Sequence, residues 1–174
     1  MMRVFTGPED APSLDERFER LVERYQTSLL RTCFLYLGDA SLAEDAVQET
    51  FLKAYRALPR FRGESSEKTW LMRIAVNTCR DVMRSGWFRH TDRRVTPDML
   101  PETAAPPDPE ASDLLAEVIR LPVKQREVVL LYYYQGMDVR EAAKALGITK
   151  SSVSGRLKSA RDNLRRLLEG REPE

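Results

Sequence analysis

The sequence predicts an all-α protein of two small helical domains, joined by a flexible proline-rich linker, with a helix-turn-helix as the second domain. Apolar residues recur at helical spacing on both sides of the linker, and no segment has a convincing strand pattern. Residues 85–112 hold five of the ten prolines and little apolar periodicity. We therefore expect a disordered N-terminus (1–13), a first domain (14–86), a linker (87–111), a second domain (112–168) and a tail (169–174).

The first domain is predicted to contain three helices. Residues 14–37 trace one long amphipathic helix, which Gly38 ends. Ser41 and Glu44 have capping-box spacing for a second helix, which ends before Pro59. A third helix is expected over residues 67–84.

The third helix has two distinct faces on a helical wheel. Its predicted core face consists of Leu71, Ile74, Ala75, Thr78 and Val82. A separate polar ridge consists of Trp70, Arg73, Asn77, Asp81 and Arg84. An aromatic ring, an amide and guanidinium groups on one ridge suit unpaired bases and phosphates. The alternative is that the tryptophan belongs to the core and the polar residues are simply solvated.

The second domain is predicted to start with helices over residues 113–121 and 122–135, the latter beginning at a proline and stopped by Gly136. Asp138 and Glu141 then form a capping-box start, Gly147 ends that helix, and Thr149 caps the next one. Two short helices separated by such a turn are typical of a helix-turn-helix.

The last helix is basic, and its outward side is predicted to carry donors suited to phosphates and base edges. These residues are Lys150, Ser151, Ser152, Ser154, Arg156 and Lys158. DNA binding is the favoured interpretation. The alternative is an antiparallel helix pair with a solvated basic face.

A third feature is acidic and surrounds the start of the second helix. It comprises Asp39, Glu44, Asp45, Gln48 and Glu49. Carboxylates at this position stabilise a helix through its dipole, or they form a docking face for a basic partner. Metal binding is not expected, because the chain has one histidine and the spacing matches no calcium loop.

The composition and the motifs argue against several classes of protein. The net charge is only +1, so charge is segregated rather than uniformly basic. No catalytic constellation or glycine-rich phosphate loop is present, and we expect neither enzymatic activity nor a cofactor. Cys33 and Cys79 form no C-x-x-C motif and are expected to be buried free thiols in a reducing cytoplasm. No apolar run is long enough to span a bilayer.

Residues 45–84 (DAVQETFLKAYRALPRFRGESSEKTWLMRIAVNTCRDVMR) closely resemble the second conserved region of bacterial sigma factors of the extracytoplasmic-function group. Residues 121–165 (LPVKQREVVLLYYYQGMDVREAAKALGITKSSVSGRLKSARDNLR) resemble their fourth region. A helix-turn-helix alone would be weak support for this resemblance, because many regulators have one. Its pairing with the motifs V-Q-E-T-F, F-R-G-E-S-S and T-W-L-x-R-I-A-x-N makes the resemblance highly specific.

The resemblance implies a dissociable subunit of RNA polymerase that recognises the −35 and −10 promoter elements and promotes DNA melting. It assigns Asp45, Gln48, Glu49 and Phe51 to the surface for the β′ clamp coiled coil. It assigns Phe61, Arg62, Ser65, Ser66, Trp70, Arg73 and Asn77 to single-stranded −10 DNA. It assigns Lys150, Ser151, Ser152, Ser154, Arg156 and Lys158 to duplex −35 DNA.

The resemblance also implies contact with the polymerase β flap and control by an anti-sigma factor, with the chain in the cytoplasm or held at the membrane by that inhibitor. Glu67 and Lys68 depart from the family pattern of an aromatic and a basic residue, and Gly155 lies inside the recognition helix where a side chain is usual. The functional alternatives are a helix-turn-helix regulator that never joins polymerase and a nucleic-acid enzyme.

Overall fold

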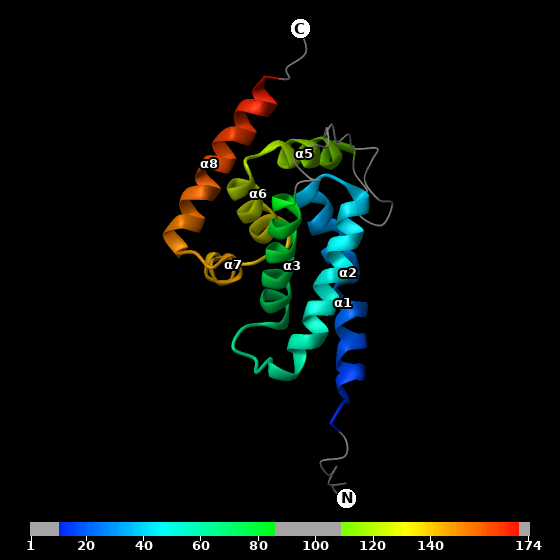
Figure 1. Cartoon of the computed structure of the whole chain (residues 1–174). Coiled ribbons are helices and arrows are strands. Elements are labelled where there is room, and N and C mark those ends of the chain that lie inside the picture. The colour runs from blue at the N-terminus through cyan, green and yellow to red at the C-terminus, as the bar shows by residue number, and fades with distance from the viewer. Residues whose placement is uncertain (1–10, 86–108, 171–174) are drawn as a thin grey trace, which may run out of the picture.

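The computed structural model describes residues 11–85 and 109–170, and within these ranges it contains helices and turns but no strand. The helices form two groups, as predicted (Figure 1). The first comprises α1 (Leu14–Leu37), α2 (Ala40–Ala57), the short 3-10 helix η2 (Leu58–Arg60) and α3 (Glu67–Arg84). The second comprises α5 (Pro109–Arg120), α6 (Val123–Val129), the π-helical turn η4 (Leu130–Tyr134), α7 (Val139–Leu146) and α8 (Lys150–Glu169). Most of the predicted linker, most of the predicted disordered N-terminus and the end of the tail lie outside the described residues.

In the first group, the structure agrees with the prediction from the sequence at two helices and differs at the N-cap of α2. The predicted bounds of α1 and α3 are confirmed, and Gly38 ends α1 at a φ of 69°. The predicted capping box of Ser41 and Glu44 is wrong. Asp39 is the N-cap of α2, and its carboxylate accepts a hydrogen bond of 2.9 Å from the Leu42 amide. Because the left-handed turn at Gly38 leaves Asp39 extended, the next helix starts at once and the serine falls inside it.

The second group confirms the helix-turn-helix and shifts one boundary. Asp138 and Glu141 make both bonds of the predicted capping box, at 2.8 and 2.9 Å. Gly147 is left-handed at a φ of 66°, and Thr149 caps α8. The helix expected to begin at residue 113 begins at Pro109 instead, so the last residues assigned to the linker are helical. Proline tolerates a first helical position, where its missing N–H would be unpaired anyway.

Helix α3 is buried more widely than its wheel predicts. Leu71, Ala75 and Thr78 of the predicted face are buried, whereas Ile74 and Val82 are only half-buried. Beyond that face, the buried side chains include Met72, Val76 and Cys79. This helix packs against α1, α2 and also α7 of the second group, so it buries more of its circumference than a three-helix domain requires.

The two groups are therefore in contact in the folded chain. Helix α7 lies against α3, and the end of α1 meets α5, α6 and η4 (Figure 1). Residues 32–37 at that end are buried on every side. A helical turn that is covered all round must have neighbours on all sides.

The two cysteines are buried free thiols, as expected. The two thiols lie within hydrogen-bonding distance of each other. The hydrogen bond with Cys33 is the main cause that raises the pKa of the Cys79 thiol, and burial is the second. A raised pKa keeps a thiol protonated and poorly reactive.

Candidate nucleic-acid and protein interfaces

The polar ridge of α3, called here the α3 ridge, consists of Trp70, Arg73, Asn77, Asp81 and Arg84. Four of its members are exposed, and the tryptophan is half-buried against the core. The Trp70 ring stacks on Phe61, with ring centroids 4.7 Å apart and planes inclined by 26°. The Trp70 ring is therefore partly packed against the protein and partly accessible, and its contact with unpaired bases stays a prediction.

A cavity of about 370 Å³ opens beside this aromatic pair. It brings together Phe61, Ser65, Trp70 and Arg73 of the predicted −10 set, and Lys144 of α7 forms part of its wall. An aromatic surface, a hydroxyl and cations in one cavity suit an unstacked base and its phosphate.

Three predicted −10 residues do not line this cavity. Arg62 and Asn77 are both exposed, and the Asn77 carbonyl oxygen accepts a hydrogen bond of 3.5 Å from Arg80. The hydroxyl of Ser66 is occupied as the N-cap of α3, where it accepts a hydrogen bond of 3.0 Å from the Thr69 amide. The serine therefore shapes the loop rather than lining the cavity.

The exposed side of α8, called here the α8 face, consists of Lys150, Ser151, Ser154 and Lys158, all solvent-exposed. Ser152 is half-buried because its hydroxyl and amide both bond to the Thr149 hydroxyl. Gly155 lies on the exposed side, and no atom lies within 4 Å of the position that a Cβ would take. Ammonium and hydroxyl donors spaced along one exposed helix side suit a DNA groove.

Arg156 does not lie on the exposed side of α8, which corrects the prediction from the sequence. Its side chain is only 24% exposed, and its guanidinium lies 3.9 Å from the carboxylate of Glu127 on α6. The position immediately precedes the buried Leu157 and follows Val153 by one turn, so it flanks the core stripe. A buried carboxylate on the neighbouring helix holds the arginine there.

Sequence reasoning missed this buried carboxylate and its partners. Glu127 is 3% exposed, and Arg80 of α3 donates to it twice, at 2.7 and 3.0 Å. The Tyr36 hydroxyl of α1 also donates to it. Burial and then the Glu127 charge raise the pKa of Tyr36, and the hydrogen bond with Glu127 raises the pKa of Arg80. The available signal was a glutamate directly before the apolar run V-V-L-L.

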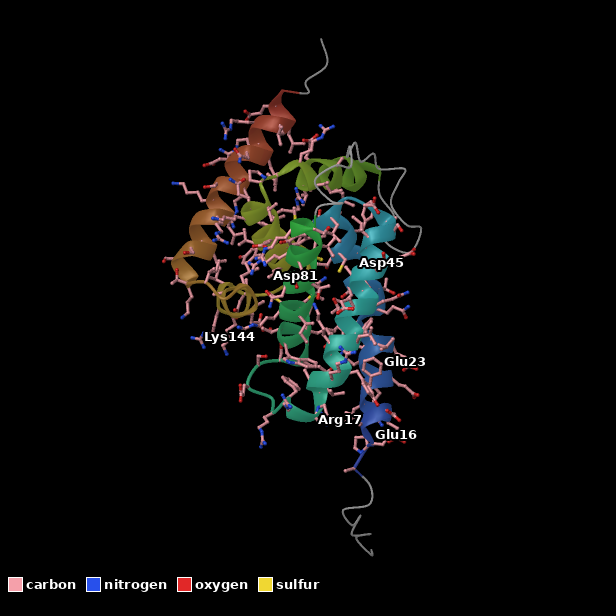
Figure 2. The ribbon with its side chains drawn as sticks, viewed as in Figure 1. Glu16, Arg17, Glu23, Asp45, Asp81 and Lys144 are labelled. Atoms are coloured by element: carbon pink, nitrogen blue, oxygen red, sulfur yellow. The ribbon has the colours of Figure 1, made fainter. Side chains whose placement is uncertain are left out.

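The acidic side of α2 is exposed at Asp45, Gln48 and Glu49, and Asp45 lies on the side of the molecule away from α7 and α8 (Figure 2). Phe51 is a correction, because it is 8% exposed and packs edge-to-face on Phe18 at 6.2 Å. Sequence reasoning missed Leu52, which is 52% exposed and lies seven residues after Asp45 on the same side. These four exposed residues, Asp45, Gln48, Glu49 and Leu52, are called here the α2 acidic face.

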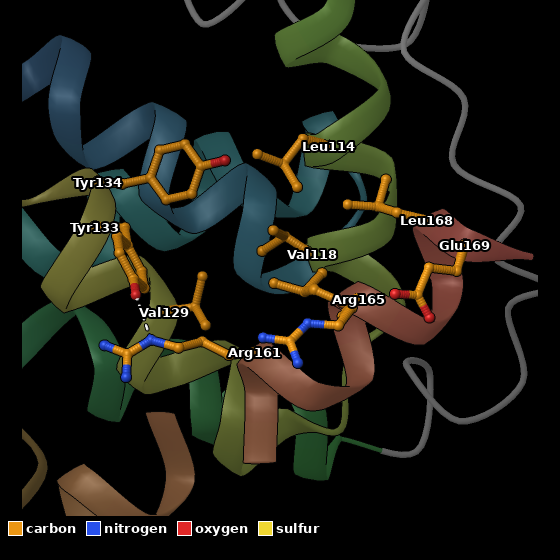
Figure 3. A pocket seen from close by; sticks show the side chains of 10 residues that line it. Leu114, Val118, Val129, Tyr133, Tyr134, Arg161, Arg165, Leu168 and Glu169 are labelled. Carbon is orange, nitrogen blue, oxygen red and sulfur yellow. Dashed lines mark hydrogen bonds between the residues drawn. The ribbon is translucent and has the colours of Figure 1, made fainter. Parts of the chain in front are cut away.

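A groove of about 570 Å³ lies between α5, α6, η4 and the end of α8 (Figure 3). Its lining is mainly apolar and aromatic, with charged residues from α8 among it. The lining residues are Leu114, Val118, Val129, Tyr133, Tyr134, Arg161, Leu164, Arg165, Leu168 and Glu169. Arg161 donates a hydrogen bond of 2.6 Å to the Tyr133 hydroxyl, and burial raises the pKa of Tyr134 to about 12. An exposed apolar groove rimmed by charged side chains marks a binding surface for another macromolecule.

No group of three or more potential metal-ligating side chains occurs in residues 11–85 and 109–170. Among the helices that the structure describes, none is both long enough and apolar enough to cross a membrane.

Comparisons with known proteins agree with this geometry. Residues 21–89 match Sigma-70 region 2, and residues 112–164 match Sigma-70, region 4. The chain is 30% identical to RNA polymerase sigma-H factor of Pseudomonas aeruginosa, over 87% of this chain and 86% of that protein. It is 32% identical to ECF RNA polymerase sigma factor SigM of Mycobacterium tuberculosis, over 87% of this chain and 76% of that protein.

Solved structures give the same result. CnrH, in complex with the cytosolic domain of CnrY, is 30% identical and superposes with a TM-score of 0.70 over 91% of both chains. The sigma factor RpoE of Bartonella quintana, in complex with the anti-sigma factor NepR, shares the fold at 24% identity, with a TM-score of 0.75 over 90% of this chain and 99% of that one. Two region matches in the expected order, together with relatives aligned over most of their length, show that this chain belongs to the extracytoplasmic-function group of the sigma-70 family.

Proposed function

We propose that this chain is an RNA polymerase sigma factor that binds core polymerase, recognises −35 and −10 promoter elements and promotes DNA melting. The observation that carries the proposal is the presence of two different nucleic-acid surfaces in one chain. The α8 face offers groove-directed donors on a helix-turn-helix, whereas the α3 ridge borders an aromatic cavity large enough to admit a base. A regulator that reads only duplex DNA has no use for the second surface.

The two surfaces divide the promoter between them. The α8 face reads the −35 element as duplex, with Lys150, Ser151, Ser154 and Lys158 directed at phosphates and base edges. Arg156 flanks this face and reaches DNA by leaving Glu127, while Ser152 sits at the N-terminus of the helix as part of its cap.

The α3 ridge reads the −10 element as a single strand. Phe61, Trp70 and Ser65 enclose a flipped base, and Arg73 and Arg62 hold the backbone. Asn77 donates to and accepts from a base edge next to the cavity.

Polymerase binding uses two further surfaces. The α2 acidic face meets the β′ clamp coiled coil, where three polar or charged side chains and the exposed Leu52 provide both charge and apolar contact. Phe51 supports this face from inside, because it packs beneath it against α1. The apolar groove between α5 and α8 accepts an apolar segment of the polymerase β flap.

Control by an anti-sigma factor is part of the proposal. Two solved structures of similar fold are complexes with a second protein, the cytosolic domain of CnrY in one and the anti-sigma factor NepR in the other. This chain has an apolar groove that an inhibitor can cover. The chain then acts in the cytoplasm, free or held at the membrane through that inhibitor. Co-expression with the product of the adjacent reading frame should give a stoichiometric complex that no longer binds core polymerase.

The division into domains is also a proposal, with units of residues 14–86 and 109–168 after the start of α5 is taken into account. Limited proteolysis of the purified chain should cut first between them. A first cut inside α3 would contradict the division.

The decisive experiment is promoter-dependent transcription with purified core polymerase. A sigma factor added alone should confer specific initiation, whereas a helix-turn-helix regulator or a nucleic-acid enzyme confers none. Start sites mapped after overexpression then give the −35 and −10 sequences. Absence of specific initiation from every mapped site, in the presence of active core, would overturn the proposal.

A further inference from the structure

A cavity of about 440 Å³ lies between the two helical groups and is called here the inter-group cavity. It shares no lining residue with the cavity beside Trp70 or with the apolar groove. Its walls come from α1 and α3 in the first group and from α6, α7 and α8 in the second. Small-molecule sites in proteins usually measure about 300–1,000 Å³, so this volume is sufficient for a ligand of that class.

The charged side chains of the inter-group cavity are mainly cationic. Four cations line it, against the single carboxylate of Glu127, and four positive charges against one negative leave a surplus of three. These cations are Arg80, Arg84, Lys124 and Arg156. Arg80 is sufficient to neutralise Glu127, because it donates to both carboxylate oxygens, at 2.7 and 3.0 Å. The charge of the other three cations is therefore not compensated within the cavity.

These three cations also have unused hydrogen-bond donors. Lys124 is exposed on α6 and makes no hydrogen bond or ion pair with the part of the chain that the structure describes. The Arg156 guanidinium lies 3.9 Å from the Glu127 carboxylate, which is too far for a hydrogen bond. Arg84 donates to the exposed Asp81 at 3.4 Å, which leaves most of its donors unused. Donors from α3, α6 and α8 that line one cavity suit an anion with several oxygen atoms.

The rest of the wall is apolar and consists mainly of Met83, Val123, Leu146 and Ile148. Leu146 is buried, and the other three are half-buried. A small inorganic anion gains nothing from such a wall, whereas a flat heterocycle buries its faces against it. The methionine adds a flexible, polarisable thioether, which makes favourable contacts with aromatic rings. The wall therefore indicates a ligand with a ring system as well as a charge.

We propose that the inter-group cavity binds a purine nucleotide that carries two or more phosphates. The phosphates lie on Arg84, Lys124 and Arg156. Guanidinium forks match phosphate oxygens in pairs, and the ammonium adds a compact charge. The purine lies against Met83 and Ile148, since a two-ring base covers more of the apolar wall than a one-ring base does. Neither the DNA surfaces nor the polymerase surfaces proposed above require this ligand.

The first experiment measures nucleotide binding by the purified full chain, without DNA, polymerase or magnesium. N-methylanthraniloyl-ADP serves as the fluorescent probe, and unlabelled ADP, adenosine and pyrophosphate are the competitors. Adenosine has the ring without phosphates, and pyrophosphate has the phosphates without the ring. ADP should displace the probe at a concentration at least about tenfold lower than either of them, because it alone uses both parts of the cavity. Absence of binding, or equal displacement by adenosine or by pyrophosphate, would overturn the proposal.

Lys124→Glu tests the phosphate end of the cavity. The side chain is exposed and has no partner among the described residues, so the fold should tolerate the change. Repulsion between the new carboxylate and the phosphates should weaken ADP binding at least about tenfold. Lys150→Glu is the matched control, because it makes the same charge change at an exposed position of the same helical group, outside the cavity. Equal losses in the two variants would show attraction by overall charge alone and would remove the site.

Met83→Gln tests the base end of the cavity. Glutamine keeps nearly the length of the half-buried methionine but replaces its thioether by an amide. ADP binding should weaken several-fold, whereas displacement by pyrophosphate should be unchanged. Lys124→Glu should weaken both. Thermal unfolding of each variant checks that the fold is retained. Unchanged ADP binding in a folded Met83→Gln variant would show that the ring does not lie on this wall.

A consequence for promoter binding rests on the proposed function. Arg156 cannot hold a nucleotide phosphate and reach DNA at the same time, so ADP should weaken the binding of −35 duplex several-fold in the parent chain and have no effect in Lys124→Glu. The two hypotheses fail separately, because ADP binding is measured without DNA and duplex binding is measured without ADP. A chain that binds duplex but not ADP contradicts only the nucleotide site. A chain that binds ADP but no promoter duplex contradicts only the proposed function.

Discussion

The α3 ridge and the α8 face are both polar, basic helix surfaces, but they stand in different relations to the rest of the chain. The α8 face lies on an outer side of the molecule, and its four residues are all solvent-exposed. The α3 ridge borders a cavity that α7 of the second group helps to wall. Arg80, two turns beyond Arg73 towards the end of α3, is bonded to Glu127.

This difference shows that exposure of a motif is decided by its neighbours and not by its own composition. A duplex site needs only an outward helix, whereas a single-strand site needs a cavity, and a cavity is easily closed by another element. The following predictions test whether the two surfaces act independently and how polymerase changes their relation.

The largest effect is expected from Asn77→Ala. Loss of an amide that reads a base edge should weaken open-complex formation by about 1–3 kcal/mol and relax the requirement at one −10 position. The exposed site should tolerate alanine without loss of helix content. Potassium permanganate footprinting on promoters with every single −10 change gives the measurement. An equal loss on all −10 variants would show that the amide positions the strand and does not read it.

Lys158→Ala should weaken the other surface without changing its sequence preference. An exposed ammonium that contacts phosphate contributes through counterion release, so its loss should flatten the slope of log Kd against log salt by about one unit. Fluorescence anisotropy with −35 duplexes at several salt concentrations measures this, and −10 melting by the holoenzyme should keep its base preference. A change confined to one −35 position would indicate base reading instead.

Glu49→Lys should weaken core binding several-fold, because it replaces an attraction to a basic coiled coil by repulsion. The effect should shrink as salt rises, since exposed charges are screened over about 10 Å at 0.1 M ionic strength. Glu23→Lys is the matched control, because it makes the same charge change at an exposed position of α1, outside the α2 acidic face. Equal losses in both variants across the salt series would remove the α2 acidic face from the interface.

The smallest effect is expected from Gly155→Ala. No atom lies within 4 Å of the position of the added methyl group, and the backbone is helical, so the fold should gain about 0.5–1 kcal/mol of stability. If the glycine serves close approach to the sugar-phosphate backbone, −35 duplex binding should weaken at the same time. Thermal unfolding and anisotropy on the same variant give both quantities. Tighter DNA binding would show that the glycine has no role in approach.

Local sequence signals predicted much of the secondary structure correctly. Gly38, Gly136 and Gly147 marked helix ends correctly, and the Asp138–Glu141 box marked the start of α7. These helix ends depend on a few neighbouring residues and their backbone angles, so the local sequence is sufficient to predict them. The error at Ser41 arose because Asp39 and Ser41, two positions apart, both have capping side chains, and the left-handed turn at Gly38 made Asp39 the cap.

The sequence by itself determined the two helical groups, the helix-turn-helix and the family. Only the tertiary structure decided that Phe51 and Arg156 turn inward, that Leu52 joins the α2 acidic face, and that Cys33 lies beside Cys79. It alone decided that a glutamate in an apolar run meets an arginine 47 residues earlier in the chain. Helical periodicity reports which side of a helix is apolar, but not which distant helix covers the other sides, because that depends on packing between segments far apart in sequence.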